Sequence, residues 1–163
     1  MTRKIRSNIF ETNSSSCHSI SIHKGNRFFY PYNDPYYFCK DGFLHIKLAE
    51  FGWGPDEFCD FYNKLRYALC MVMETEYENY DELFDDFYFL PGFKLIEEVV
   101  KEKCNCDGII IEPLKGYYKY GYIDHQSTED YSCLQDFLDD YGLNIERFLF
   151  DENVVMVIDN DNH

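Results

Sequence analysis

The sequence is poor in basic residues. It has 15 Lys and Arg against 30 Asp and Glu in 163 residues, which gives a formal net charge of −15. Proteins bind nucleic acid mainly because Lys and Arg side chains displace counterions from the phosphates. We therefore expect no direct binding of DNA or RNA. The first 27 residues are an exception, because Glu11 is their only acid and they carry five basic residues: Arg3, Lys4, Arg6, Lys24 and Arg27.

Long apolar runs and ordered cysteine patterns are also missing. No stretch reaches the roughly 18 residues that a membrane-spanning helix needs, and the opening Met-Thr-Arg-Lys-Ile-Arg is not an apolar signal segment. The 7 cysteines have no disulfide-framework spacing. Cys104-x-Cys106 is tighter than a zinc knuckle and has no matching second pair. We expect a cytoplasmic protein with reduced thiols, no metal site and no contact with a membrane.

Several common catalytic motifs are absent. The sequence has no phosphate-binding Walker loop, no dinucleotide-binding glycine fingerprint and no His-Glu-x-x-His helix. A glycine-rich nucleophile elbow is missing too, so a hydrolase fold has no support. We expect no cofactor. Internal repeats and low-complexity linkers are also lacking, and the chain therefore reads as one domain spanning residues 1–163.

A dense polar motif stands near the N-terminus. Asn13, Ser14, Ser15 and Ser16 precede His18 at the entrance of an alternating segment that predicts a strand. Such side chains bond the local backbone readily, so one interpretation is a tight, self-satisfied turn. The other is an anion-binding cradle of hydroxyl and backbone N–H groups, with His18 as donor or proton carrier. Both interpretations stay open.

A second polar group, Asp124-His125-Gln126-Ser127, follows a predicted strand, where a rigid element can position loop residues. If the two motifs lie on adjacent strands, their polar ends converge and supply a nucleophile, a base and an orienting carboxylate. The candidate catalytic residues are then Ser15, His18, Asp124 and His125, with Asn13, Ser14, Ser16 and Ser127 as binding residues.

An acidic stretch with interleaved aromatic residues covers residues 74–86 and continues to residue 89. Its acids are Glu74, Glu76, Glu78, Asp81, Glu82, Asp85 and Asp86, and no Lys or Arg lies between Arg66 and Lys94. A solvated acidic helix is the usual explanation of such a run. The aromatic residues favour a docking face for a basic partner, because a wholly solvated face has no need of them. The proline-interrupted aromatic segment 28–38 is a competing contact surface.

Hydrophobic periodicity predicts an α+β domain with a mixed or mostly antiparallel sheet of about five strands and three to four amphipathic helices. We expect strands at 17–23, 42–48, 109–111, 117–124 and 154–158, with 109–111 and 117–124 paired as an antiparallel hairpin. We expect helices at 55–73, with Pro55 as first residue, at about 95–103 after a break at Pro91-Gly92, and at 132–141, opened by a Ser132/Gln135 capping box and closed by Gly142. Trp53 is expected in the core.

The N-terminal string resembles the opening of a loose family of small proteins encoded by phages and mobile elements of Gram-positive bacteria. The residues that carry the resemblance are Arg6-x-Asn8-x-Phe10-Glu11-Thr12-Asn13-Ser14-Ser15-Ser16-x-His18-Ser19, with shorter similarities at Glu50–Trp53, Gly121–Ser127 and Asp159-Asn160. Some relatives are anti-CRISPR proteins, and no settled activity comes with the family.

Two functional hypotheses follow. The resemblance implies an accessory protein that inhibits a host defence factor, such as a CRISPR nuclease. Its acidic, aromatic surface would bind a basic surface that normally handles nucleic acid. The alternative is an enzyme or small-ligand binding protein, for an anion or a nucleotide, that uses Ser14–Ser16, His18 and His125.

Overall fold

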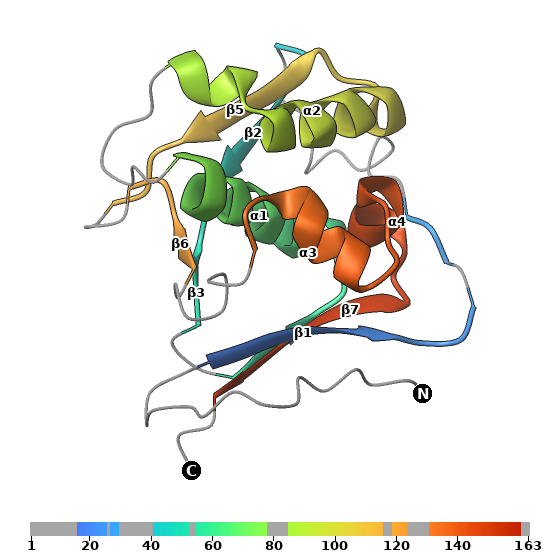
Figure 1. The fold of residues 1–163 in the computed structure, drawn as a ribbon. Helices are drawn as coiled ribbons and strands as arrows, with labels where there is room; N and C mark the ends of the chain where they lie inside the picture. The colour runs from blue at the N-terminus through green and yellow to red at the C-terminus, as the bar shows by residue number, and fades with distance from the viewer. Residues whose placement is uncertain are drawn as a thin grey trace.

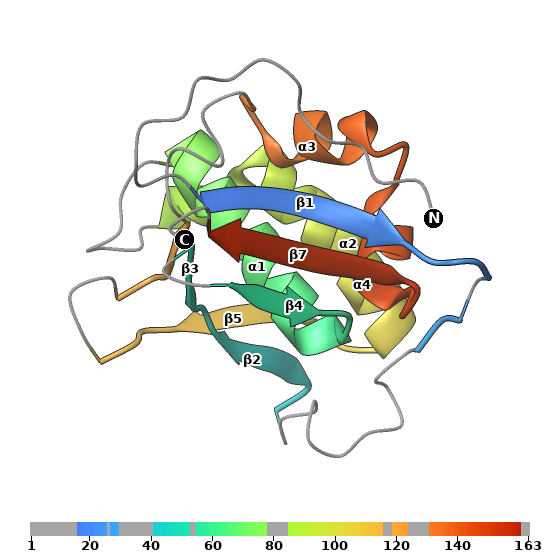
Figure 2. The same ribbon diagram turned by 90° about the horizontal axis from the view of Figure 1, so that it is seen from below.

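The computed structural model describes residues 16–25, 27–29, 41–52, 55–77, 85–115, 119–123 and 131–160. Over these residues it contains four α-helices and seven strands in three small sheets, so the predicted α+β class is confirmed (Figure 1). The expected sheet of about five strands is instead divided into one antiparallel sheet and two parallel pairs. The helices lie on one side of the antiparallel sheet, and Figure 2 shows this sheet from the other side.

The antiparallel sheet has the order β1-β7-β4, with β1 spanning Ser16–Ile22, β7 Val154–Asn160 and β4 Asp56–Phe58. His18 pairs with Ile158 and Ile20 pairs with Met156 in its register. His18 and Ile20 are buried while Ser19 and Ser21 are half-buried, which is the alternation expected of a strand with one face on the core. The predictions of strands at 17–23 and 154–158 are confirmed.

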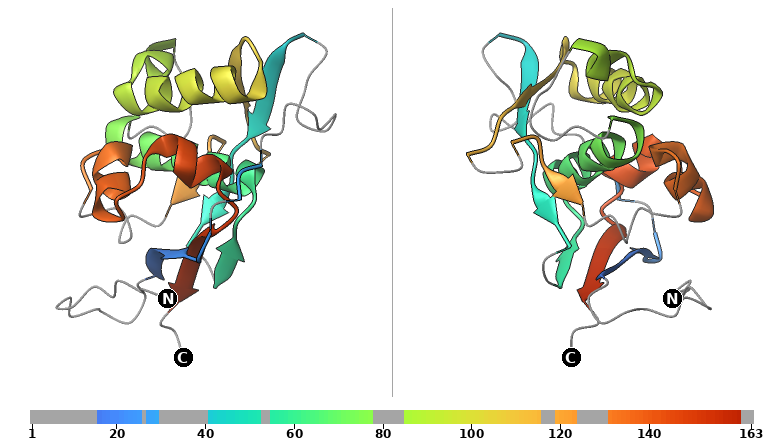
Figure 3. Two further views of the ribbon diagram at one scale, coloured as in Figure 1. Left: turned by 90° about the vertical axis from the view of Figure 1, so that its right-hand side faces the viewer. Right: turned by 60° about the vertical axis from the view of Figure 1, so that its left-hand side comes forward.

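The two other pairs are parallel. β2 (Phe43–Lys47) pairs with β5 (Gly108–Glu112), and β3 (Glu50–Phe51) pairs with β6 (Tyr122–Ile123). The predicted hairpin is therefore wrong: β5 and β6 each pair with an earlier segment of the chain. Helical residues between β2 and β5 provide the crossover that parallel strands require. Figure 3 shows β2, β3 and β4 following one another along one side of the helices.

The first helix, α1, spans Phe61–Val72 and starts later than predicted. Residues 56–58 pair with β7 instead, so Pro55 is not its first residue. Asp60 is the N-cap, because its carboxylate accepts a hydrogen bond of 2.9 Å from Asn63 N. The chain continues from α1 as a π-helical turn, Met73–Tyr77.

The remaining helices are α2 (Pro91–Cys104), α3 (Leu134–Asp140) and α4 (Ile145–Phe150). Pro91 and Gly92 open α2 rather than break the chain before it, and Gly92 N donates to Glu76 Oε2 over 2.9 Å. The predicted Ser132/Gln135 capping box of α3 is wrong. Cys133 is the N-cap, and the Ser132 hydroxyl hydrogen-bonds to the Asp136 carboxylate. Gly142 follows α3 with a φ of +64°, as expected of a helix-ending glycine.

The core is centred on Tyr67 of α1. Its buried ring lies against Phe51 of β3, Phe58 of β4 and Phe137 of α3, with centroids 5.2, 6.2 and 5.9 Å away. One contiguous cluster of buried apolar side chains includes residues of all four helices. Aromatic packing thus joins the antiparallel sheet, a parallel pair and the helices.

Candidate functional site

His18 is a core residue of β1. Its side chain is 8% exposed, and Nδ1 lies 3.0 Å from the Tyr67 hydroxyl oxygen. The two rings are 5.7 Å apart and tilted by 54°. A buried polar pair of this kind ties β1 to α1, as expected of a histidine that supports the fold.

Most of the other candidate residues lie outside the described part of the chain. They are Asn13, Ser14, Ser15, Glu78, Asp81, Glu82, Asp124, His125 and Ser127, together with Trp53 and most of the aromatic segment 28–38. Ser16 is described through its backbone, which pairs with Asn160. The two polar motifs were expected to converge only if they lay on adjacent strands, but β1 pairs with β7 and β6 pairs with β3. That premise is wrong, and the catalytic roles remain predictions.

The last part of the acidic stretch forms a 3-10 helix, Asp85–Phe89, which we call the 3-10 turn. Asp85 and Asp86 are exposed, and Phe89 is 75% exposed. Phe87, by contrast, is fully buried, with its ring centroid 5.3 Å from Tyr77 and 5.4 Å from Phe93. The turn is therefore anchored by one aromatic ring while it presents a second ring and two carboxylates to solvent.

The exposed ring of Phe89 already meets one cation. Lys94 Nζ lies 5.7 Å from the centroid of Phe89 and 5.8 Å from that of Phe93, and it donates to Glu97 Oε2 over 2.9 Å. These distances are typical of cation–π contacts. The aromatic face of the 3-10 turn is thus suited to a positively charged group.

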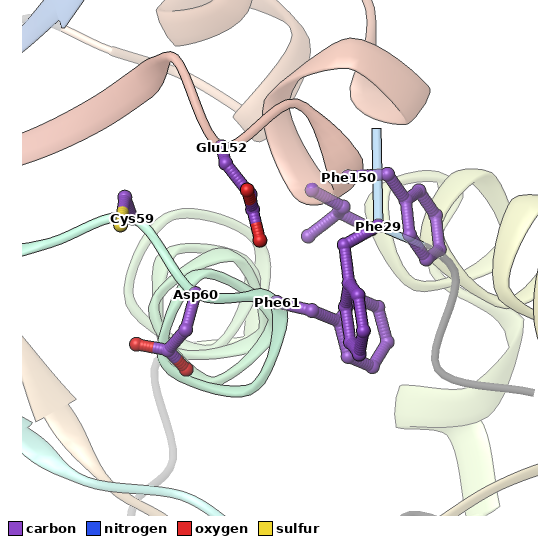
Figure 4. A pocket seen from close by; sticks show the side chains of 7 residues that line it. Phe29, Cys59, Asp60, Phe61, Phe150 and Glu152 are labelled. Carbon is purple, nitrogen blue, oxygen red and sulfur yellow. The ribbon is translucent and has the colours of Figure 1, made fainter. Parts of the chain in front are cut away.

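A pocket of about 110 Å³ opens beside the start of α1 (Figure 4). It is lined by Phe29, Cys59, Asp60, Phe61, Leu149, Phe150 and Glu152. These residues come from three segments that are far apart in the sequence, and of them only Phe29 lies in a predicted contact surface, the aromatic segment 28–38. Sequence reasoning therefore missed this pocket.

Near this pocket, Lys64 of α1 is a fully buried lysine. Its Nζ donates to the carbonyl oxygens of Asp151 and Val154 over 2.9 and 3.3 Å. Burial lowers the pKa of Lys64 to about 8 from 10.5. The sequence does indicate that Lys64 faces the core, since Phe61, Lys64, Leu65 and Ala68 have the spacing of one helix face.

We expect Lys64 to make stability rise at alkaline pH. Between its folded pKa of about 8 and its ordinary value of 10.5, the unfolded chain keeps a proton that the folded chain has lost. The free energy of unfolding should then increase by about 1 kcal/mol per pH unit relative to a Lys64→Met variant. Below this window both states are protonated, and the difference should be constant. Urea unfolding from pH 7 to 10 measures this, with exposed Lys101→Met as control; parallel profiles for wild type and Lys64→Met would contradict it.

The thiols of Cys104 and Cys106 are buried. Burial raises the pKa of Cys104 to about 12 and also raises that of Cys106, so both side chains are protonated at neutral pH. Within the residues that the structure describes, no group of three or more His, Cys, Asp or Glu side chains is placed to hold a metal ion.

Across the same described ranges, no helix has the length and apolar character to cross a membrane.

Comparison with protein-family models, with curated proteins and with solved structures finds no match to this chain.

Proposed function

We propose that this protein is an accessory protein of a phage or mobile element that binds and inhibits a host defence factor in the bacterial cytoplasm, with a CRISPR nuclease as the suggested target. The observation that carries the proposal is the 3-10 turn: Phe89 is 75% exposed beside the exposed carboxylates of Asp85 and Asp86. The resemblance of the N-terminal motif to phage and mobile-element proteins supplies the biological context.

The chemistry of the turn suits a basic partner. Exposed aromatic side chains contribute most at the centre of protein interfaces, where a partner removes them from water. Neighbouring carboxylates select basic surfaces and accelerate the encounter. A net charge of −15 extends this preference over the protein and opposes direct binding to nucleic acid. A basic surface that normally holds DNA or RNA satisfies both requirements.

The alternative hypothesis of an enzyme or ligand-binding site has less support. His18 is buried and bonded to Tyr67, and β1 and β6 pair with different strands. Neither feature favours an open site at the polar motif.

The proposal predicts that the protein blocks DNA cleavage by a guide-loaded CRISPR nuclease, measured with purified components. The double variant Asp85→Lys/Asp86→Lys should raise the inhibitory concentration by about 100-fold, because it places like charges against the basic partner. Asp56→Lys/Glu57→Lys is the matched control, since it makes the same charge change at two neighbouring exposed carboxylates of β4. Circular dichroism and thermal melting should show both variants folded.

The control separates a specific surface from general charge. Equal loss in both double variants would show that only net charge matters. Full inhibition by Asp85→Lys/Asp86→Lys would remove the 3-10 turn from the interface. Undiminished cleavage by every CRISPR nuclease tested, at protein in large excess, would reject the suggested target.

A further inference from the structure

The pocket beside the start of α1 has an aromatic floor. The rings of Phe61 and Phe150 stack with their centroids 4.8 Å apart and their planes inclined by 17°. Phe61 and Phe150 are only 2% and 1% exposed, whereas the third ring, that of Phe29, is 39% exposed and offers the accessible aromatic surface. Its backbone N–H donates to the Phe150 carbonyl over 2.9 Å, so the ring is held at the pocket by a main-chain bond.

Two acidic residues, Asp60 and Glu152, also line the pocket, and Figure 4 shows the Asp60 carboxylate turned away from the rings. Asp60 is fixed as the N-cap of α1, with Asn63 N and Nδ2 each 2.9 Å from its oxygens. Glu152 N donates to the Arg27 carbonyl over 2.8 Å. Figure 4 shows the Glu152 carboxylate extending into the space between Cys59 and Phe29. Aromatic surface and negative charge therefore meet at one opening.

The turn that carries Glu152 is itself held firmly. The buried Asp151 carboxylate accepts hydrogen bonds from Arg27 N, Asn153 N and Arg147 Nε over 3.1, 3.0 and 3.3 Å. Because the backbones of Asp60 and Glu152 are held in place, these residues line the pocket before a ligand binds. Less conformational entropy is then lost on binding.

We infer that this pocket binds an arginine side chain of a basic partner protein. A guanidinium group stacks on aromatic rings and forms paired hydrogen bonds with carboxylates, while its aliphatic stem covers apolar surface. Arg27 Nε already lies 2.9 Å from Glu152 Oε2, and because the Arg27 side chain is 82% exposed, an arginine of the partner competes with it for this carboxylate. The volume of about 110 Å³ is too small for a cofactor, since such sites usually have 300–1,000 Å³. The identity of the partner rests on the proposed function, but the chemistry of the pocket does not.

The first test is titration with N-acetyl-arginine amide, followed by NMR. Saturable shifts are expected at the backbone amides of Cys59, Phe61 and Glu152, with a dissociation constant of about 1 mM. The N-acetyl-citrulline amide has the same shape without the charge and should bind about tenfold more weakly. Equal binding of both compounds would show an apolar slot without charge recognition, and no shift with either would overturn the assignment.

The second test changes Glu152. Glu152→Gln should weaken binding of the arginine compound about tenfold, whereas Glu98→Gln, an exposed glutamate on α2, should leave it unchanged. The arginine compound should also slow alkylation of the exposed Cys59, mapped by peptide mass spectrometry, and the citrulline compound should not. Unchanged binding by Glu152→Gln would overturn the role of this carboxylate.

The two proposals fail in different ways. If the protein binds the arginine compound but inhibits no nuclease, the pocket assignment is supported and the proposed function is rejected. Inhibition that survives Glu152→Gln, in a protein that does not bind the compound, would reject the pocket alone.

Discussion

Replacing Phe87 by alanine is expected to lower the free energy of unfolding by about 3–5 kcal/mol. The ring is fully buried against Tyr77, Tyr88 and Phe93, so its removal leaves a cavity between the 3-10 turn and the start of α2. The turn should lose its fixed position, and the inhibition that we propose should decline with it. Urea unfolding followed by circular dichroism measures the stability change.

Phe89→Ala is the matched variant on the same turn. Phe89 is 75% exposed, so the free energy of unfolding should change by no more than about 0.5 kcal/mol. Inhibition should nevertheless weaken by about 30-fold if the ring is a central contact of the interface. A stable Phe89→Ala variant with full inhibition would show that the exposed ring has no part in binding. Strong destabilisation would assign it to the fold instead.

His18→Ala should cost about 2–4 kcal/mol of stability, because it removes a buried ring and its hydrogen bond to Tyr67. A double-mutant cycle with Tyr67→Phe should give a coupling energy of about 1 kcal/mol, which a ligand or a catalytic role would not produce. Thermal and urea unfolding of the single and double variants provide the values.

The control for this experiment lies on the same strand. Ser21 is half-buried on the opposite face of β1, and Ser21→Ala should change stability little. If His18→Ala melts like wild type but loses a measurable activity, the polar motif is a functional site and the structural interpretation of His18 is wrong.

Local patterns were sufficient for much of the fold. Alternation identified β1, and the apolar runs 109–111 and 154–158 identified the buried β5 and β7. Partner choice was not local: β5 and β6 pair in parallel with β2 and β3, and a parallel pair depends on a long crossover that no nearby residue encodes. The predicted start of α1 was wrong because Pro55 and Asp60 are both residues that commonly begin a helix. Residues 56–58, which lie between them, form β4 and pair with β7.

The candidate site was foreseen only in part. Composition singled out the acidic, aromatic stretch, but it could not tell that the Phe87 ring is buried and the Phe89 ring exposed, because both are phenylalanines two residues apart. Burial separates them. The pocket could not be predicted from the sequence for another reason: Phe29, Phe61 and Phe150 come together only in the tertiary fold.

The central strand of the antiparallel sheet, β7, follows every other described element in the chain. During synthesis on the ribosome, β1 and β4 emerge first and have no strand between them until residues 154–160 are made. Non-local pairing of this kind slows folding and exposes apolar surface meanwhile. A stop codon before residue 154 would therefore not merely shorten the protein; it would leave two separated edges for chaperones and proteases to recognise.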